Sequence, residues 1–392
     1  MKRILAAAAI MCLLVSGIAF AQAVAPEPIK IGAVFAVTGP ASKLGEPERN
    51  TVKMIEAEVN AAGGIKGRPI EIIVEDDGGV EANTVNAVKK LITNDKVIAI
   101  VGPTTSGASL AVKPIAEENS VPLVSCAAAE KIVNPVAKWV FKTPQKDSDA
   151  AIRIFENMKS KGISKIAIIT SSDGFGSTGR EQLKKHSPAL GIEIVADETY
   201  APADTDMTAQ LTKIKASEAQ AVINWSVVPG QVIVAKNMRQ LGMTIPLYQS
   251  HGFGNPKNIQ ACGEAGEGII FPAGRLLIVD ELGADSKQKA VLAKYKADYQ
   301  AKYPNDQVST FGGHAYDALW LVLNAIKAVG PDKAKIRDYI ENTKGFVGTG
   351  GIFNFSAEDH CGLDKSAFEM QTVKGGKFVA LSSVKEEVKA KK

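Results

Sequence analysis

The sequence predicts an α/β protein made of two doubly wound lobes, each a mainly parallel sheet with helices on both faces. Short, continuously apolar runs alternate with longer stretches of helical spacing, which is typical of buried parallel strands joined by helices. This alternation occurs twice along the chain. Removing a 21-residue leader from the 392 residues leaves 371, which suggests two domains of about 150 residues with some to spare.

The first series supplies the first lobe. Strands are predicted at residues 29–37, 70–74, 97–101 and 121–124, with helices at 46–62, 80–94 and 107–118. The second series predicts strands at 165–170, 193–200, 221–225, 246–248 and 268–271, with helices at 147–161, 176–190, 207–217 and 230–241.

The remaining elements predict a chain that crosses between the lobes more than once. Helices at 285–303, 311–329 and 332–343 have no strong strand between them and are expected to pack on the first lobe, and short strands at 351–355, 368–373 and 378–381 follow. We therefore assign 22–144 and 274–350 to lobe one, 145–273 and 351–381 to lobe two, and 382–392 to a basic tail. The cleft between the lobes, at the carboxyl ends of the strands, is the expected ligand site.

The first 21 residues have the pattern of a cleaved secretory signal peptide. Lys2 and Arg3 precede an apolar stretch at 4–20, and Ala19-Phe20-Ala21 is a small-x-small cleavage site. The apolar run is short for a membrane span and no second run follows, so a released, periplasmic protein is expected. Export also separates the protein from cytosolic ATP and nicotinamide cofactors.

The composition is that of an ordinary globular protein and gives the chain a small net positive charge. The formal charge of +4 falls to +2 without Lys2 and Arg3, and the basic tail is typical of a solvated chain end. A nucleic-acid partner is therefore not expected. The mature chain keeps three cysteines, Cys126, Cys262 and Cys361, so at most one disulfide forms; Cys262 and Cys361 are the candidate pair, and the sequence leaves open whether they bond.

Several motifs, in order, resemble the periplasmic branched-chain amino acid binding proteins. They include Thr38-Gly39-Pro40, Asn60-Ala61-Ala62-Gly63-Gly64-Ile65-Lys66-Gly67, Glu75-Asp76-Asp77, Ile100-Val101-Gly102-Pro103 and Phe311-Gly312-Gly313-His314-Ala315-Tyr316-Asp317-Ala318. The resemblance covers residues 29–381. It implies a type I solute-binding fold, with two lobes joined by three crossovers that close on a ligand handed to a membrane-embedded ABC permease. Such a protein is no enzyme, needs no cofactor, and is expected to act as a monomer.

The resemblance also implies the site. Ser106 and Thr105 lie between a strand and a helix, where hydroxyls and backbone amides at the positive end of the helix dipole suit a carboxylate. The alternative is that one of them only caps the helix. Ala127 is expected to contribute backbone, and Phe175 and Phe311 match ligand-facing aromatic positions of the family, although an isolated phenylalanine is more often core than site.

The chain departs from the family pattern where relatives bind the α-ammonium group. His251 stands in place of the acidic side chain, and Ala129 in place of a threonine; Trp225, Val227 and Leu44 fall where relatives present a glycine and tyrosines. Without acid and hydroxyl, a buried ammonium would remain unpaired, which is costly. We therefore expect an aromatic or branched-chain acid without a neighbouring ammonium, with His251 meeting a ring hydroxyl or carbonyl. The alternative for His251 is a turn histidine bonded to backbone. The alternatives for function are a binder of branched-chain amino acids proper and a ligand-sensing module.

Catalytic and metal sites are not predicted. The segment Gly174-Phe175-Gly176-Ser177-Thr178-Gly179 spells G-x-G-x-x-G, but three residues separate it from the preceding strand, unlike a dinucleotide site. Neither a G-x-S-x-G elbow nor H-E-x-x-H occurs, and the four histidines are scattered. The adjacent carboxylates of Asp76-Asp77 and Glu117-Glu118 are typical of solvated surfaces rather than metal sites.

Overall fold

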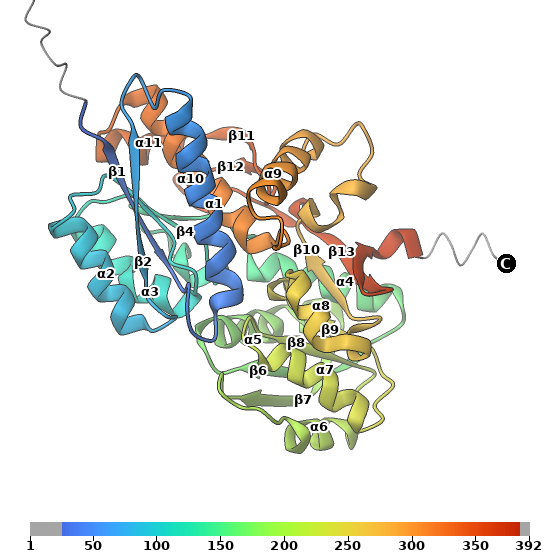
Figure 1. Cartoon of the computed structure of the whole chain (residues 1–392). Helices are drawn as coiled ribbons and strands as arrows, with labels where there is room; N and C mark the ends of the chain where they lie inside the picture. Colours follow the sequence, from blue (N-terminus) through green and yellow to red (C-terminus); the bar gives the residue numbers. More distant parts are fainter. Residues whose placement is uncertain (1–25, 385–392) are drawn as a thin grey trace, which may run out of the picture.

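A computed structural model describes residues 26–384 (Figure 1). The predicted leader at 1–21 and most of the basic tail lie outside the described residues. None of the helices within 26–384 combines the length and apolarity that a membrane crossing requires.

The first sheet has five strands in the order β2-β1-β3-β4-β5, and every pair is parallel. This is the 2-1-3-4-5 order of a doubly wound sheet. The strands are β1 (Ile29–Phe35), β2 (Ile70–Asp76), β3 (Ile100–Val101), β4 (Leu123–Ser125) and β5 (Val140–Lys142), and the helices between them are α1 (Ser42–Ala61), α2 (Glu81–Thr93) and α3 (Ser106–Glu118). β5 is a strand that the sequence analysis missed.

The second sheet repeats this order and adds two antiparallel strands. Its order is β14-β13-β10-β9-β8-β6-β7, with β6 to β10 parallel. The strands are β6 (Lys165–Ser171), β7 (Glu193–Tyr200), β8 (Ala221–Trp225), β9 (Leu247–Gln249), β10 (Ile270–Ala273), β13 (Glu369–Lys374) and β14 (Lys377–Ala380), and the helices are α4 (Asp147–Ser160), α5 (Gly174–His186), α6 (Thr208–Lys215), α7 (Gly230–Gln240) and α8 (Pro256–Cys262).

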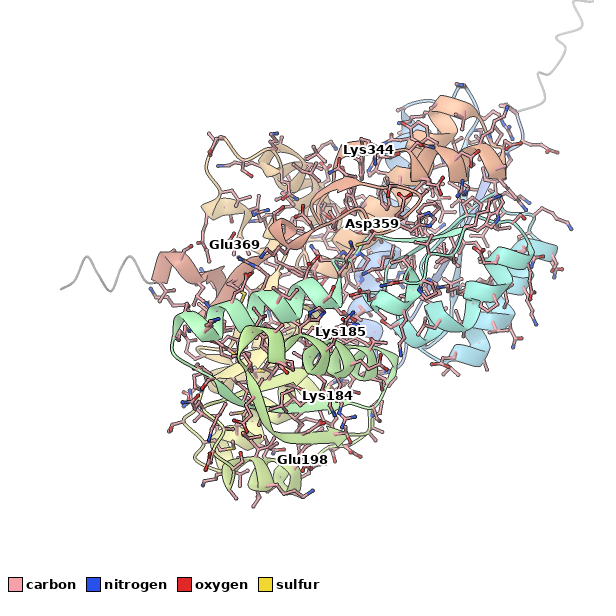
Figure 2. All side chains as sticks on the ribbon, turned by 180° about the vertical axis from the view of Figure 1, so that it is seen from behind. Lys184, Lys185, Glu198, Lys344, Asp359 and Glu369 are labelled. Atoms are coloured by element: carbon pink, nitrogen blue, oxygen red, sulfur yellow. The ribbon has the colours of Figure 1, made fainter. Side chains whose placement is uncertain are left out.

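The edge strand β7 is protected by charge. Lys184 of α5 lies 3.0 Å from Asp197, and Lys213 of α6 lies 2.9 Å from Glu198. Figure 2 shows Lys184 and Glu198 on the outer face of this lobe. Charged side chains on an edge strand disfavour pairing with another chain.

Three late helices return to the first lobe, as predicted. They are α9 (Lys289–Lys302), α10 (Thr310–Val329) and α11 (Lys333–Glu341). Residues of α10 and α11 share the hydrophobic core of the first sheet. Tyr295 and Tyr299 of α9 pack in a separate cluster with Met54 of α1. In Figure 1 these helices lie beside α1, although they follow it by more than 200 residues in the sequence.

The segment after α11 differs from the prediction. Strands β11 (Lys344–Val347) and β12 (Ile352–Asn354) form a separate antiparallel hairpin. Phe353, Phe355 and Leu363 are buried in the core of the first lobe, so residues 351–367, which we had assigned to lobe two, pack on lobe one instead. The chain crosses to the second sheet just before β13.

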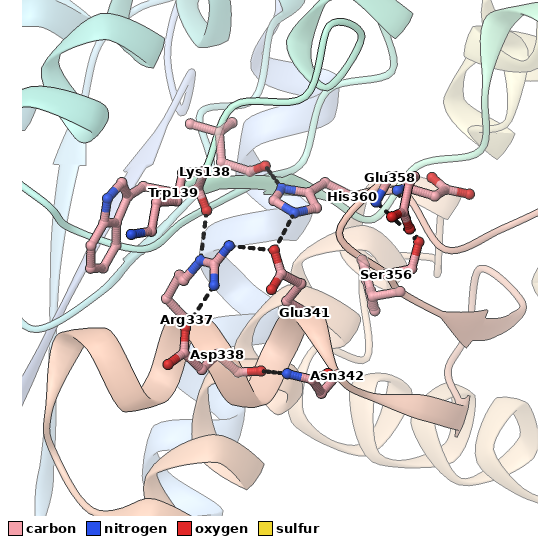
Figure 3. Close-up of polar contacts among 12 residues, drawn as sticks. Lys138, Trp139, Arg337, Asp338, Glu341, Asn342, Ser356, Glu358 and His360 are labelled. Atoms are coloured by element: carbon pink, nitrogen blue, oxygen red, sulfur yellow. Dashed lines mark hydrogen bonds and ion pairs between the residues drawn. The ribbon is translucent and has the colours of Figure 1, made fainter.

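A polar network holds this crossing segment against the first lobe (Figure 3). The buried ring of His360 stacks on Phe141 with 4.2 Å between centroids. Its Nδ1 lies 2.9 Å from the carbonyl oxygen of Val140, and its Nε2 lies 3.2 Å from Glu341 Oε1. Arg337 bonds to the same carboxylate and, at 2.9 Å, to the carbonyl of Lys138. An ion pair also joins two of the segments that cross between the lobes: Lys146, just after β5, lies 2.8 Å from Asp359, between β12 and β13.

The candidate disulfide is contradicted. Cys126, Cys262 and Cys361 are free and buried. Cys262 lies in a core cluster of the second lobe, whereas Cys361 lies in the core of the first. The two thiols belong to different cores and therefore do not meet.

Candidate functional site

A pocket between the two lobes collects most of the predicted site residues. Its free volume is about 30 Å³, close to the space that one water molecule takes in the liquid, so the lobes are shut tightly on it. Fourteen residues line it: Leu44, Thr104, Thr105, Ser106, Cys126, Ala127, Ala128, Pro144, Phe175, Val227, His251, Gly252, Phe311 and His314. Most follow the carboxyl ends of β3, β4, β5, β6, β8 and β9, where ligands bind in doubly wound sheets.

Eight of the ten predicted residues line this pocket, and two do not. Ala129 is buried behind it, and its backbone N–H donates to Ser106 Oγ at 3.2 Å. Trp225 is also fully buried, behind Phe175 and His251, with ring centroids 5.8 and 5.6 Å away. Trp225 supports the pocket wall rather than forming it. Gly179 leaves room for this indole, since a Cβ there would lie 2.1 Å from Trp225 Nε1.

The start of α3 forms the polar end of the pocket. Thr105 is the N-cap residue, and its hydroxyl oxygen accepts from the N–H of Ala108 at 3.4 Å. Ser106 has a different role, because its oxygen accepts from Ala129 and its own O–H is left to donate. The first N–H groups of a helix have no intrahelical acceptor. A hydroxyl and backbone amides therefore meet at a positive helix terminus, which suits an anion.

Ala127 lines the pocket but its N–H is already engaged. It donates to Ser125 Oγ at 3.0 Å. The neighbouring carbonyl of Ala128 accepts from Lys142 Nζ at 2.7 Å. The fully buried Lys142 also donates to the carbonyls of Pro144 and Gln145, both at 3.0 Å. These three partners are neutral, so the ammonium adds positive potential beside the pocket.

The carboxyl groups nearest to this region lie outside the pocket lining. Glu48 is fully buried and accepts from the hydroxyl of Thr104. Burial raises its pKa well above the usual value. Burial likewise raises the pKa of Asp147 to about 7, against the opposing charge of Lys142. No aspartate or glutamate is found among the described residues that line the pocket.

His251 lies in a short 3₁₀ helix, His251–Phe253, directly after β9. Its ring is packed among Phe175, Trp225 and Phe368, with centroids 5.3, 5.6 and 5.5 Å away. The nearest carboxyl oxygen, Asp147 Oδ1, lies 3.5 Å from its Nε2 without a hydrogen bond. The backbone-bonded turn histidine that we considered is therefore wrong, because neither ring nitrogen has a hydrogen-bond partner among the described residues.

The lobes already touch around the pocket. Gly254 accepts from the N–H and the hydroxyl of Thr310, both at 3.1 Å, and Asn255 donates to the carbonyl of Lys43 at 2.8 Å. A Cβ on Gly174 would lie 2.8 Å from the backbone nitrogen of Gly107, so the starts of α5 and α3 are in direct contact. These contacts describe a closed arrangement.

The G-x-G-x-x-G segment opens α5 rather than a phosphate loop. Asp173 caps this helix by accepting from the N–H groups of Phe175 and Gly176, both at 2.9 Å. The amides that a phosphate would use are already bonded to a carboxylate. In addition, no group of three or more potential metal-ligating side chains occurs within residues 26–384.

Sequence comparison identifies the family. A profile described as periplasmic binding protein matches residues 28–377. The Leu/Ile/Val-binding protein BraC3 of Rhizobium johnstonii is 27% identical over 322 residues, which are 81% of this chain and 83% of that protein.

Structural comparison agrees. An extracellular ligand-binding receptor from Rhodopseudomonas palustris HaA2 has a TM-score of 0.85 and 29% identity, covering 90% of this chain and 99% of the other. The branched-chain amino acid transporter substrate binding protein LivJ of Streptococcus pneumoniae, in complex with isoleucine, has a TM-score of 0.80 and 29% identity, covering 90% and 98%. The predicted α/β, type I periplasmic binding fold is thereby confirmed. Because the profile spans most of the sequence, this chain belongs to the periplasmic binding protein family.

Proposed function

We propose that this protein is the extracytoplasmic binding protein of an ABC importer. It captures a small carboxylate that lacks an α-ammonium group, and delivers it to a membrane-embedded permease. The proposed periplasmic location is supported by the leader-like pattern at 1–21 and by the relatives, which are named as periplasmic or extracellular binding proteins.

The observation that carries the ligand class is the charge balance of the pocket. One end offers the Ser106 hydroxyl and the first amides of α3, with the buried Lys142 nearby. All of these favour an anion. An α-ammonium group would find no carboxylate on the described pocket wall. A buried, unpaired ammonium costs several kcal/mol.

The rest of the pocket suits an apolar body. Leu44 and Phe311 contribute from the first lobe, and Phe175 and Val227 from the second. Aromatic and aliphatic side chains that converge from both lobes enclose a ring or a branched chain when the lobes shut. An aromatic or branched-chain acid satisfies both the polar end and this apolar enclosure.

Binding and closure form the mechanism. The ligand carboxylate first meets the start of α3 on one lobe, and the second lobe then swings over its body and excludes water. The closed surface, formed by both lobes, is the signal for the permease. Among the described residues that line the pocket, no hydroxyl or thiol is hydrogen-bonded to a histidine, so we propose binding rather than catalysis.

A second candidate is a binder of branched-chain amino acids proper. The names of the relatives favour it, since BraC3 is a Leu/Ile/Val-binding protein and LivJ holds isoleucine. His251 and Ala129 argue against it, because they replace the groups by which the family resemblance implies ammonium binding.

Titration calorimetry with a matched ligand pair tests the proposal. Leucine and 4-methyl-2-oxopentanoate share the side chain and the carboxylate and differ only at the α position. We expect the oxo acid to bind about 100-fold or more tightly than leucine, which corresponds to about 3 kcal/mol. Benzoate serves as a second acid with a ring body. Tighter binding of leucine than of both acids would reject the proposal.

A further inference from the structure

Besides the start of α3, where the ligand carboxylate is proposed to bind, two histidines line the pocket, one from each lobe. His251 belongs to the second lobe and His314 to α10 of the first. Only 7% and 6% of their surfaces are exposed. Nδ1 and Nε2 of His251 and Nδ1 of His314 are buried without a hydrogen-bond partner among the described residues. Buried polar atoms are rarely left unpaired, so these nitrogens point to a missing partner.

Both rings are held in the uncharged form. Burial lowers the pKa of His314 to about 3, with the charge of Lys142 adding to the effect. Burial and then the charges of Lys142 and His314 hold the pKa of His251 well below its usual value. A neutral imidazole carries one N–H donor and one nitrogen acceptor. Two such rings do not attract a second anion, and they leave both donors and acceptors to be satisfied.

The rings are also fixed in place. His251 is packed among three aromatic rings, and the edge of Phe311 faces His314 with 6.3 Å between centroids. Nε2 of His251 faces Asp147 Oδ1 at 3.5 Å, and this oxygen is itself without a hydrogen-bond partner, so Asp147 is the nearest partner for that nitrogen. The Nδ1 atoms of His251 and His314 have no comparable neighbour among the described residues, so these two nitrogens are left for a ligand in the pocket to satisfy.

We propose that His251 and His314 form a second polar subsite that selects a hydroxyl group on the ligand, so that the preferred ligand is a hydroxylated aromatic acid. A hydroxyl both donates and accepts, and so it is complementary to a neutral imidazole of either tautomer. A plain hydrocarbon at this place would leave the nitrogens unpaired, and unmet polar groups are the strongest source of discrimination between ligands of one shape. This inference rests on the proposed carboxylate function and adds a requirement to it.

The test compares isosteric ligands by titration calorimetry. The 2-, 3- and 4-hydroxybenzoates are measured against the methylbenzoates of the same substitution, because a methyl group matches the hydroxyl in size but makes no hydrogen bond. We expect at least one hydroxybenzoate to bind about 10-fold or more tightly than its methyl counterpart. The readout is the ratio of the two dissociation constants rather than either constant alone.

Three variants assign the discrimination to residues. His251→Phe and His314→Leu remove the ring nitrogens. In each variant we expect the ratio of hydroxybenzoate affinity to methylbenzoate affinity to fall to near 1. The conservative variant His314→Gln keeps a donor and an acceptor and is expected to retain part of the ratio. The control is His186→Leu on α5, where Nε2 is also buried without a partner but lies outside the pocket lining, and its ratio should match the wild type.

The outcomes separate the two proposals. Methylbenzoates that bind as well as every hydroxybenzoate would overturn the hydroxyl subsite while leaving the carboxylate function standing. A hydroxyl preference that survives both His251→Phe and His314→Leu would overturn the assignment to these residues. Leucine binding more tightly than every acid in the series would overturn both proposals.

Discussion

In the proposed function, the hydroxyl of Ser106 is the side-chain contact on which ligand capture depends most. Its oxygen already accepts from Ala129, so the O–H is free to donate to a carboxylate. We expect Ser106→Ala to weaken binding of the preferred acid about 10- to 100-fold, since a hydrogen bond to a charged group contributes about 1.5–3 kcal/mol. Calorimetry measures the change. Ser160→Ala, an exposed serine that bonds only within α4, is the control and should bind normally. Equal affinity in Ser106→Ala and wild type would contradict this role.

The pH dependence of folding is set in part by His314. Its pKa is about 3 in the folded protein, because of burial, and about 6.5 when unfolded. Acidification therefore protonates the unfolded chain first and lowers stability as pH falls below 6.5. Between pH 7 and 5, ligand-free wild type should lose about 2 kcal/mol more of its free energy of unfolding than His314→Gln, measured in urea. Parallel pH profiles of the two proteins would contradict the burial of a neutral imidazole.

At the residue scale, the residues that line the polar end of the pocket were easier to predict from the sequence than those that form its apolar walls. Ser106 was recognisable because it stands between a strand and a helix. Trp225 was misplaced because every residue of β8 is buried, and a strand buried on both faces carries no alternation to tell which side faces the cleft. His314 was missed for the same kind of reason, since the half of α10 that contains it is buried nearly all round.

At the element scale, the proposed closure brings the starts of two helices together. Gly174 begins α5 and approaches the backbone of Gly107 in α3, where an added Cβ would lie 2.8 Å from nitrogen. Gly174→Ala should weaken ligand affinity by about 10-fold by obstructing closure, while the unfolding temperature of the ligand-free protein is unchanged or higher, because alanine suits a helix better than glycine. Ser177→Ala, an exposed change in the same turn, is the control. Unaltered affinity in Gly174→Ala would show that the helices need not meet.

Most elements of the two parallel sheets were predicted, and the errors concentrate in short connecting elements and in the crossing segments. The main parallel strands and most helices were predicted because continuous apolar runs and helical spacing extend over many residues. The three-residue β5, the seven-residue α8 and β11 were not predicted, whereas the strand predicted at 351–355 matches β12. α1 begins at Ser42, four residues before the predicted start at 46, so Pro47 lies inside the helix rather than in its first turn. Residues 351–367 were assigned to the wrong lobe because their partners, such as Phe141, are distant in the sequence.

At the scale of the whole molecule, the two lobes should move as bodies. Contacts such as Thr310 to Gly254 and Asn255 to Lys43 join them in the closed form and are made by residues outside the hydrophobic cores of both lobes. Small-angle scattering should therefore report a smaller radius of gyration on adding a saturating benzoate-type acid, and no change on adding leucine at the same concentration. The same radius with and without acid would contradict ligand-driven closure.

The central claim is that the pocket takes a carboxylate without an ammonium group, and native mass spectrometry tests it most directly. The purified protein, first freed of any carried-over ligand, is exposed to an equimolar mixture of benzoate and leucine, whose masses are easily separated on the intact complex. We predict that the complex carries benzoate. A complex that carries leucine instead would contradict the claim.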